Sequence, residues 1–173
     1  MTYRVCFVCT GNICRSPMAE YVFRARVAEA GLADRVEIDS AGTGGWHEGE
    51  SADPRTVAVL HDHGYDCDHV ARRFQPSWFA RRDLVIALDA GHLRALRRLA
   101  PTQEDARKVR LLRAYAHRSP GALAPDPDLG DDLDVPDPYY GGLDGFEECL
   151  EMVEEASAGL VAAVREHLEG RAA

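Results

Sequence analysis

Short apolar runs alternate with amphipathic stretches along most of this chain. The runs span residues 3–8, 36–40, 84–88 and 109–112, and they are typical of strands buried in a parallel sheet. The run 36–40 alternates apolar and polar residues, which favours a place near the sheet edge. Helical spacing predicts helices over 18–30, 55–63 and 91–99, and a long amphipathic helix over 145–168.

Residues with known positional preferences mark several helix ends. Ser16 and Pro17 provide an N-cap and a first-turn proline for the first helix, and Gly31 is expected to follow its end. Asp89 is expected to cap the helix after the third strand. Residues 113–142 contain prolines, glycines and aspartates without periodicity, so we predict a long loop, and such loops are usually functional.

The alternation of strands with helices predicts the fold class. Four parallel strands with helices on both faces make a doubly wound α/β sheet, a three-layer sandwich, and we expect residues 1–173 to form one such domain. Ligands of these folds bind beyond the carboxyl ends of the strands, often at the first strand-to-helix turn. In this chain that turn is residues 9–16.

Composition and charge narrow the choice of partners. The chain has 173 residues, 46% of them hydrophobic, and a net charge of −9, which disfavours nucleic acids and anionic membranes because like charges repel. The sequence has no apolar run long enough for a transmembrane helix and no evident signal peptide. The odd count of 5 cysteines favours reduced thiols in a cytoplasmic protein. We expect a monomer or weak self-association.

The segment CTGNICRS, residues 9–16, which we call the 9–16 loop, combines features that suit an oxyanion. A helix N-terminus directs free N–H groups and partial positive charge at what precedes it, and successive loop amides can surround a phosphate. Arg15 offers a planar fork that binds two phosphate oxygens. Gly11 and Asn12 can adopt the positive φ that such a curl requires.

The positive field of the helix N-terminus, the loop amides and Arg15 also favours the nucleophilic thiolate of Cys9, at the end of the first strand. Ser16 can donate its hydroxyl to the sulfur and ease the later departure of the thiolate. A cysteine at a strand end is, by itself, more often a small buried hydrophobe. The glycine, the arginine and the helix start each add a separate reason, so we interpret Cys9 as a nucleophile. The predicted phosphate-binding residues are Thr10, Gly11, Asn12, Ile13, Cys14, Arg15 and Ser16.

Two motifs carry a resemblance to a known family. Residues 8–20, VCTGNICRSPMAE, closely resemble the signature loop of the low-molecular-weight protein tyrosine phosphatases, and residues 137–140, DPYY, resemble that family's second signature. The segment SAGT at 40–43 with Trp46, and DPR at 53–55, also match the family pattern, so the resemblance spans nearly the whole chain. It implies hydrolysis of protein phosphotyrosine without metal or cofactor, through a cysteinyl-phosphate intermediate.

The resemblance also assigns catalytic roles. Cys9 would attack phosphorus while the loop amides and Arg15 hold the equatorial oxygens, and Asp137 would protonate the leaving phenolate and then activate water. An aspartate before proline is, by itself, a common turn residue, so the role of Asp137 depends on the family match. The expected partners are phosphotyrosine-containing proteins, and phosphate or another oxyanion in the site.

A phosphotyrosine ring needs apolar, preferably aromatic walls. The candidate pocket residues are Ile13, Trp46, Tyr139 and Tyr140. His69 resembles a family position that supports the loop, in a hydrogen-bond network with Asn12, Ser16 and Ser40. Cys14 suggests a redox role, because a reversible disulfide with Cys9 would protect the nucleophile from over-oxidation.

Three alternatives are less favoured. Protein arginine phosphatases resemble this loop but tend to carry threonine where Ile13 stands and another residue where Tyr139 stands. Arsenate reductases need further closely spaced cysteines, whereas Cys67 and Cys149 are far apart in sequence. A catalytically silent phosphoprotein reader would not need both nucleophile and acid.

Neither histidines nor aspartates outside the loop predict a metal site. His61 and His63 stand near a helix end without accompanying cysteines or carboxylates. An acidic run lacks the glycine and terminal glutamate of a calcium loop, so we expect a solvated loop. Its members are Asp126, Asp128, Asp131, Asp132 and Asp134.

Overall fold

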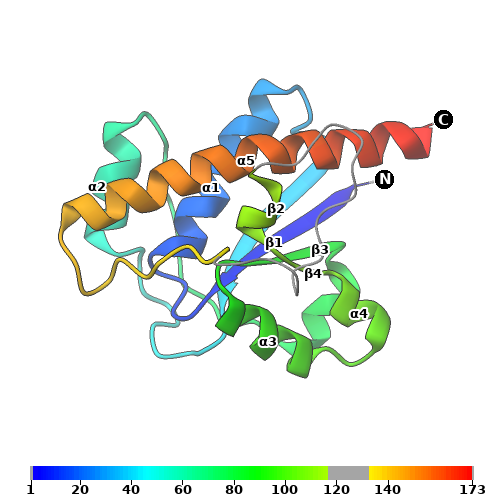
Figure 1. Ribbon diagram of the computed structural model, residues 1–173, viewed down its shortest axis with the longest axis horizontal. Helices are drawn as coiled ribbons and strands as arrows, with labels where there is room; N and C mark the ends of the chain where they lie inside the picture. Colours follow the sequence, from blue (N-terminus) through cyan, green and yellow to red (C-terminus); the bar gives the residue numbers. More distant parts are fainter. Residues whose placement is uncertain (1, 117–132, 173) are drawn as a thin grey trace.

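The computed structural model describes residues 2–116 and 133–172, and its strands form one parallel sheet (Figure 1). The strands are β1 (Tyr3–Cys9), β2 (Val36–Gly42), β3 (Leu84–Ala87) and β4 (Val109–Leu111), in the order β2-β1-β3-β4. The helices are α1 (Arg15–Glu29), α2 (Pro54–Asp62), α3 (Ala90–Leu99), α4 (Gln103–Arg107) and α5 (Leu143–Ala172). The predicted doubly wound four-stranded sheet is confirmed, with β2 at an edge.

Side chains that alternate along β1 supply both layers of the core. Phe7 packs on the face covered by α1, α2 and α5, where its ring lies 5.5 Å from that of Phe23. Cys6 and Val8 point to the opposite face and pack with Phe79 and with the apolar side of α3. Burial of each large apolar side chain stabilises the fold by about 1.5–3 kcal/mol, and the two layers hold β1 in place.

The chain order places a topological switch point beside β1. From β1 the chain passes to β2 on one side, and it later reaches β3 on the other side. The carboxyl end of β1 is therefore flanked by loops that diverge, which opens a crevice there. The loop after β2 is tied to this end, because the Thr43 N–H donates to the Cys9 carbonyl at 2.8 Å and the Gly44 N–H donates to the Thr10 carbonyl at 3.0 Å.

The predicted start of α1 was wrong. The helix begins at Arg15, its N-cap is Cys14, and no side chain caps it. Ser16 lies inside the first turn, and its hydroxyl contacts the Cys9 sulfur instead of the helix amides. Because no side chain occupies the first amides, they remain available to an external anion. The other signals are confirmed: Asp89 caps α3 by accepting the His92 N–H at 2.8 Å, and Gly31 follows α1 with φ of 75°.

Three short elements were not predicted: the 3₁₀ segments η1 (Pro76–Arg81) and η2 (Leu112–Tyr115), and α4. They are too short for periodicity to reveal them. Within the predicted loop 113–142, η2 forms the beginning, and residues 133–142 are irregular. None of the helices within residues 2–116 and 133–172 has the length and apolar character that crossing a membrane requires.

The acidic run is only partly within the described residues. Asp126, Asp128, Asp131 and Asp132 lie outside them. Asp134 accepts the Ala90 N–H at 2.8 Å at the start of α3, so the prediction of a merely solvated side chain is wrong for this residue.

Candidate active site

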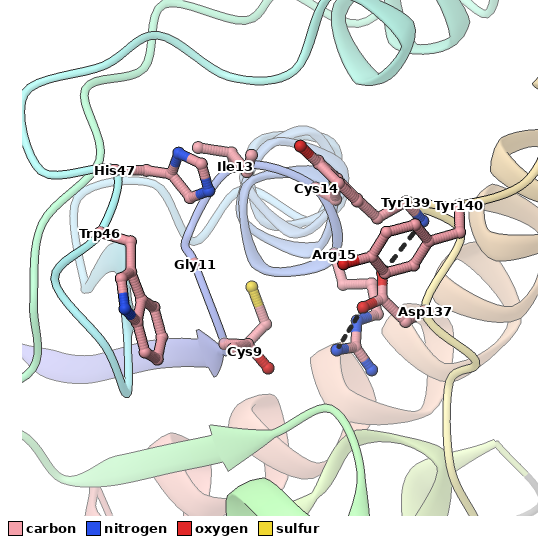
Figure 2. A pocket seen from close by; sticks show the side chains of 11 residues that line it. Cys9, Gly11, Ile13, Cys14, Arg15, Trp46, His47, Asp137, Tyr139 and Tyr140 are labelled. Atoms are coloured by element: carbon pink, nitrogen blue, oxygen red, sulfur yellow. Dashed lines mark hydrogen bonds and ion pairs between the residues drawn. The ribbon is translucent and has the colours of Figure 1, made fainter.

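A pocket of about 220 Å³ opens at the carboxyl end of β1. In Figure 2 the Cys9 side chain points from the end of β1 toward the N-terminus of α1, while Trp46 and His47 stand on one side and Asp137, Tyr139 and Tyr140 on the other. The lining residues are Cys9, Thr10, Gly11, Ile13, Cys14, Arg15, Trp46, His47, Asp137, Tyr139 and Tyr140. All four residues predicted for the substrate pocket are among them.

Cys9 and Ser16 form a close buried pair. The Cys9 sulfur lies 2.9 Å from the Ser16 hydroxyl oxygen. That oxygen already accepts a hydrogen bond from the Asn12 side-chain amide at 2.9 Å, and the alternative acceptor for its proton, the Ala41 carbonyl, is farther away at 3.4 Å. Ser16 therefore directs its proton at the sulfur, which stabilises a thiolate there.

Asn12 holds the curl of the 9–16 loop. It has φ of 59°, whereas Gly11 does not have positive φ, so this expectation is confirmed for Asn12 and wrong for Gly11. The fully buried Asn12 amide donates to Ser16 and to Ser40, and its oxygen accepts the Arg72 N–H at 2.8 Å. These three hydrogen bonds of the side chain offset the energetic cost of the left-handed backbone at Asn12.

His69 and Ser40 lie behind this loop, as the sequence suggested. His69 Nε2 lies 2.7 Å from the Asn12 carbonyl oxygen, so this nitrogen carries the proton and donates. Burial lowers the pKa of His69, in spite of this hydrogen bond and of nearby Glu20, which raise it. Ser40 donates to Glu20 at 2.7 Å. The loop therefore rests on a continuous buried network, which limits its alternative conformations.

Arg15 is buried to 4% exposure and is held at the floor of the pocket by three oxygens. Its Nη1 donates to Asp89 and to the Val135 carbonyl, both at 2.9 Å, and its Nη2 lies 3.8 Å from the Asp137 carboxylate. Burial opposes the charge on Arg15, but Cys9, Asp89 and Asp137 outweigh it and raise its pKa above the ordinary value. The guanidinium is therefore a fixed cation beside the thiol.

Asp137 sits at the pocket mouth with a side chain that is 47% exposed. Its carboxylate accepts the Tyr139 N–H at 3.0 Å, an Asx-type turn that orients both residues. Arg55, at the start of α2, lies over the Tyr139 ring and donates to the Gly141 carbonyl at 3.0 Å. Since Arg55 is also bound by Asp53, the segment that carries Asp137 is anchored to α2.

Trp46 and His47 form the opposite wall. The side chain of Trp46 is exposed, and its ring lies directly over Gly44, where any β-carbon would collide with it. His47 contacts Glu50 and lies so close to Gly11 that a β-carbon there would be 2.9 Å from the imidazole. A glycine is therefore needed at position 11 because the His47 side chain lies too close to the backbone for a β-carbon.

Cys14 occupies the N-cap position of α1 and faces Asp53 and Thr56. Burial, together with Asp53 and Cys9, raises the pKa of Cys14 to about 12. This thiol therefore stays protonated at neutral pH. All cysteines of the chain are free thiols.

Four residues of the site were not predicted as such: His47, Arg55, Asp89 and His92. Asp89 was identified only as a helix cap, and it also binds Arg15. His92 lies 2.8 Å from the Thr10 hydroxyl, although 82 residues separate them. Of these four residues, only Arg55 had a signal in the sequence, because it belongs to the motif DPR of the family pattern.

No cluster of histidine, cysteine and carboxylate side chains suited to a metal ion occurs in the part of the chain that the structure describes.

Fold and site together define an α/β protein that presents a thiol within an anion-binding loop at the end of its first strand. The family model "Low molecular weight phosphotyrosine protein phosphatase" matches residues 4–170. This chain therefore belongs to that family.

Individual relatives agree with this assignment. A "Low molecular weight protein-tyrosine-phosphatase" of Streptomyces coelicolor is 76% identical over 100% of both chains. "Low molecular weight protein-tyrosine phosphatase A" of Mycobacterium tuberculosis is 47% identical over 90% of this chain and 88% of its own. A solved protein tyrosine phosphatase of Entamoeba histolytica superposes with a TM-score of 0.85 at 32% identity, covering 96% of this chain and 99% of that one.

Proposed function

We propose that this protein hydrolyses phosphotyrosine in proteins through a cysteinyl-phosphate intermediate on Cys9. One observation carries the proposal: the Cys9 sulfur, the fixed guanidinium of Arg15 and the carboxylate of Asp137 line a single pocket. A nucleophile, an oxyanion clamp and a proton donor are the three groups that cleavage of a phosphate ester requires.

In the first step the Cys9 thiolate attacks phosphorus and an S–P bond forms. The free amides of the 9–16 loop and Arg15 hold the equatorial oxygens, whose charge is spread in the transition state. The bond from phosphorus to the tyrosine oxygen breaks, and Asp137 donates its proton to that oxygen. The phenol leaves as a neutral molecule, which lowers the barrier.

In the second step Asp137, now ionised, takes a proton from a water molecule as that water attacks phosphorus. The S–P bond breaks and inorganic phosphate forms. Ser16 donates its hydroxyl to the departing sulfur at the 2.9 Å separation described above, so the thiolate is a better leaving group. The enzyme returns to its starting protonation state.

The walls of the pocket favour an aryl phosphate. Trp46 on one side and Tyr139 and Tyr140 on the other provide aromatic faces, and Ile13 adds an aliphatic surface at the floor. An aromatic ring packs well between such walls, whereas a guanidinium phosphate would lose hydration against Ile13.

The direct test measures turnover of p-nitrophenyl phosphate and of matched phosphotyrosine and phosphoarginine peptides in the presence of a chelator. We expect turnover of the first two and a marked preference for the phosphotyrosine peptide. Acid quenching during turnover should trap the intermediate, and the peptide that contains Cys9 should then show a mass increase of about 80 Da, the mass of one HPO₃ group. Preference for phosphoarginine, or absence of the adduct, would contradict the proposal.

We further infer a cytoplasmic location and a protective role for Cys14. Peroxide would oxidise Cys9 to a sulfenic acid, and the Cys14 thiol would displace water from it to form a disulfide. The odd count of 5 cysteines favours a reducing compartment. Without Cys14, excess peroxide would oxidise the sulfenic acid further to the irreversible sulfinic acid. Activity lost to excess peroxide should therefore return with dithiothreitol in the wild type and not in Cys14→Ala.

A further inference from the structure

A hydrogen bond ties the first residue after the nucleophile to helix α3. The Thr10 hydroxyl oxygen lies 2.8 Å from His92 Nε2, and His92 is 5% exposed. Thr10 belongs to the pocket lining, whereas His92 stands behind it. His92 thus contacts the site through Thr10 and through its neighbour Asp89.

The surroundings of the imidazole decide which nitrogen carries its proton. His92 Nδ1 lies 3.1 Å from the Asp89 carboxylate without hydrogen-bond geometry. A bare lone pair facing a carboxylate oxygen at this distance would be repelled, whereas an N–H dipole is attracted. The proton therefore sits on Nδ1, Nε2 is an acceptor, and the Thr10 hydroxyl donates to it.

The same turn of the chain also holds the other end of the loop. One oxygen of Asp89 accepts the His92 N–H at 2.8 Å, and the other accepts from Arg15 at 2.9 Å. Thr10 and Arg15 are the residues at which the curl of amides begins and ends. The N-cap and first turn of α3, residues 89–92, therefore brace both ends of the curl.

We propose that His92, as a neutral imidazole, is a positioning residue that fixes the Thr10 end of the phosphate-binding curl. This inference depends on the proposed function. The bond removes the rotational freedom of the Thr10 side chain and keeps the hydroxyl proton directed away from the bound phosphate. The adjacent amides then meet the transition state without reorganisation, which is the condition under which such donors are most effective.

Two near-isosteric variants separate this role from simple packing. In His92→Gln the side-chain amide oxygen reaches the place of Nε2 and can accept from Thr10. In His92→Asn the amide reaches only the place of Nδ1, so the contact with Asp89 is retained and that with Thr10 is lost. The matched control is His61→Gln, a substitution of an exposed histidine on α2.

We expect His92→Asn to lower kcat on p-nitrophenyl phosphate about five- to tenfold, the size of one ordinary hydrogen bond, with little change in KM. His92→Gln should recover most of the loss, and His61→Gln should match the wild type. The affinity for orthovanadate, which adopts the geometry of the transition state, should fall in parallel with kcat. The melting temperatures of all variants identify any loss that is due to unfolding.

A double-substitution cycle tests whether His92 acts through Thr10. Thr10→Val removes the hydroxyl and keeps the shape of the side chain. If the proposal holds, Thr10→Val and Thr10→Val combined with His92→Asn have the same kcat, because the second substitution removes nothing further. The ¹⁵N chemical shifts of His92 should show a protonated Nδ1 and an unprotonated Nε2.

The possible failures are distinct. Equal activity of His92→Asn and His92→Gln, additive losses in the cycle, or a protonated Nε2 would each overturn the role of His92 while the wild type remains active. If the wild type does not hydrolyse p-nitrophenyl phosphate at all, the proposed function is wrong as well. If one of the two His92 variants does not fold, two measurements still test the proposal. One is the protonation of the His92 nitrogens in the wild type, and the other is the kcat of Thr10→Val compared with that of the His92 variant that folds.

Discussion

The floor and the rim of the pocket are built in opposite ways. Asn12 and Ser16 at the floor have no exposed surface, and Arg15 has 4%. At the rim, Trp46 is 75% exposed and Tyr140 is 93% exposed. Hydrogen bonds join the floor residues to one another and to four further segments, which contain Ser40, His69 with Arg72, Asp89 and Val135. The described contacts of the rim aromatics are mainly with neighbouring residues of their own loops.

This contrast separates two tasks. Charge that develops on phosphorus is stabilised only by donors that are already in place, so the floor must be rigid. A ring entering from solvent needs contact area, which exposed aromatic side chains provide. Substitutions at the floor are therefore expected to change kcat and stability, and substitutions at the rim are expected to change KM.

The largest effect is expected from Cys9→Ser. A serine hydroxyl is not ionised at neutral pH, so the attacking anion is lost, and turnover should fall by about 10⁴-fold or more. The floor is otherwise intact, so the variant should still bind phosphotyrosine peptides, as measured by calorimetry. Cys67→Ser is the matched control, since Cys67 lies outside the pocket lining. Turnover by Cys9→Ser near the wild-type rate would exclude Cys9 as the nucleophile.

The next effect is expected from Asp137→Ala, at the boundary between floor and rim. Loss of the proton donor should reduce kcat about 10²–10⁴-fold on a phosphotyrosine peptide. The reduction should be smaller for p-nitrophenyl phosphate, because its more acidic phenol leaves without full protonation. Asp144→Ala, which removes a carboxylate from the first turn of α5, is the control. An equal loss on both substrates would argue against proton donation.

The buried histidines behind the floor predict how stability depends on pH. Burial lowers the pKa of His92 to about 4, and that of His69 is also lowered. The unfolded chain binds a proton near its ordinary value while the folded chain does not, so stability is complete above about pH 6.5 and is lost as the pH falls toward 4. For His92 this amounts to about 3 kcal/mol, or a few hundredfold in the unfolding equilibrium.

Urea unfolding at intervals between pH 7 and pH 4.5 measures this loss. The lowered pKa values of Asp53 and Asp89 act only near and below their ordinary value, so this window isolates the histidines. The His92→Gln variant should lose much less stability over the same range. Identical slopes in the two proteins would show that His92 does not titrate as described.

The two regions also differ in how far the sequence reveals them. Cys9, Arg15 and the helix start are adjacent in the chain, so their shared purpose can be inferred from local physical chemistry. Asp137 and the rim aromatics were inferred from the family pattern alone. The order of strands and helices was predicted because buried strands and amphipathic helices have distinct periods.

Residues that support the floor from a distance could not be found in this way. Asp89 already had a local explanation as the cap of α3, and nothing in its surroundings indicates a second bond to Arg15, 74 positions away. Ser16 shows the converse error: a serine before proline is typical of an N-cap, but its hydroxyl has a stronger partner in Cys9. A local preference such as helix capping does not predict the structure where a tertiary partner competes for the same side-chain atom.

The smallest effects are expected at the rim. Trp46→Ala or Tyr140→Ala removes one aromatic contact, worth about 0.5–1.5 kcal/mol, so KM for a phosphotyrosine peptide should rise about two- to tenfold while kcat stays within about twofold. Tyr139→Ala should cost more than Tyr140→Ala, since Tyr139 is only 38% exposed and its ring lies 5.5 Å from the Arg55 guanidinium. Steady-state kinetics with one peptide for all variants measures this order. A fall in kcat with unchanged KM at Tyr140 would mean that the rim takes part in the chemistry, and the division between floor and rim would not hold.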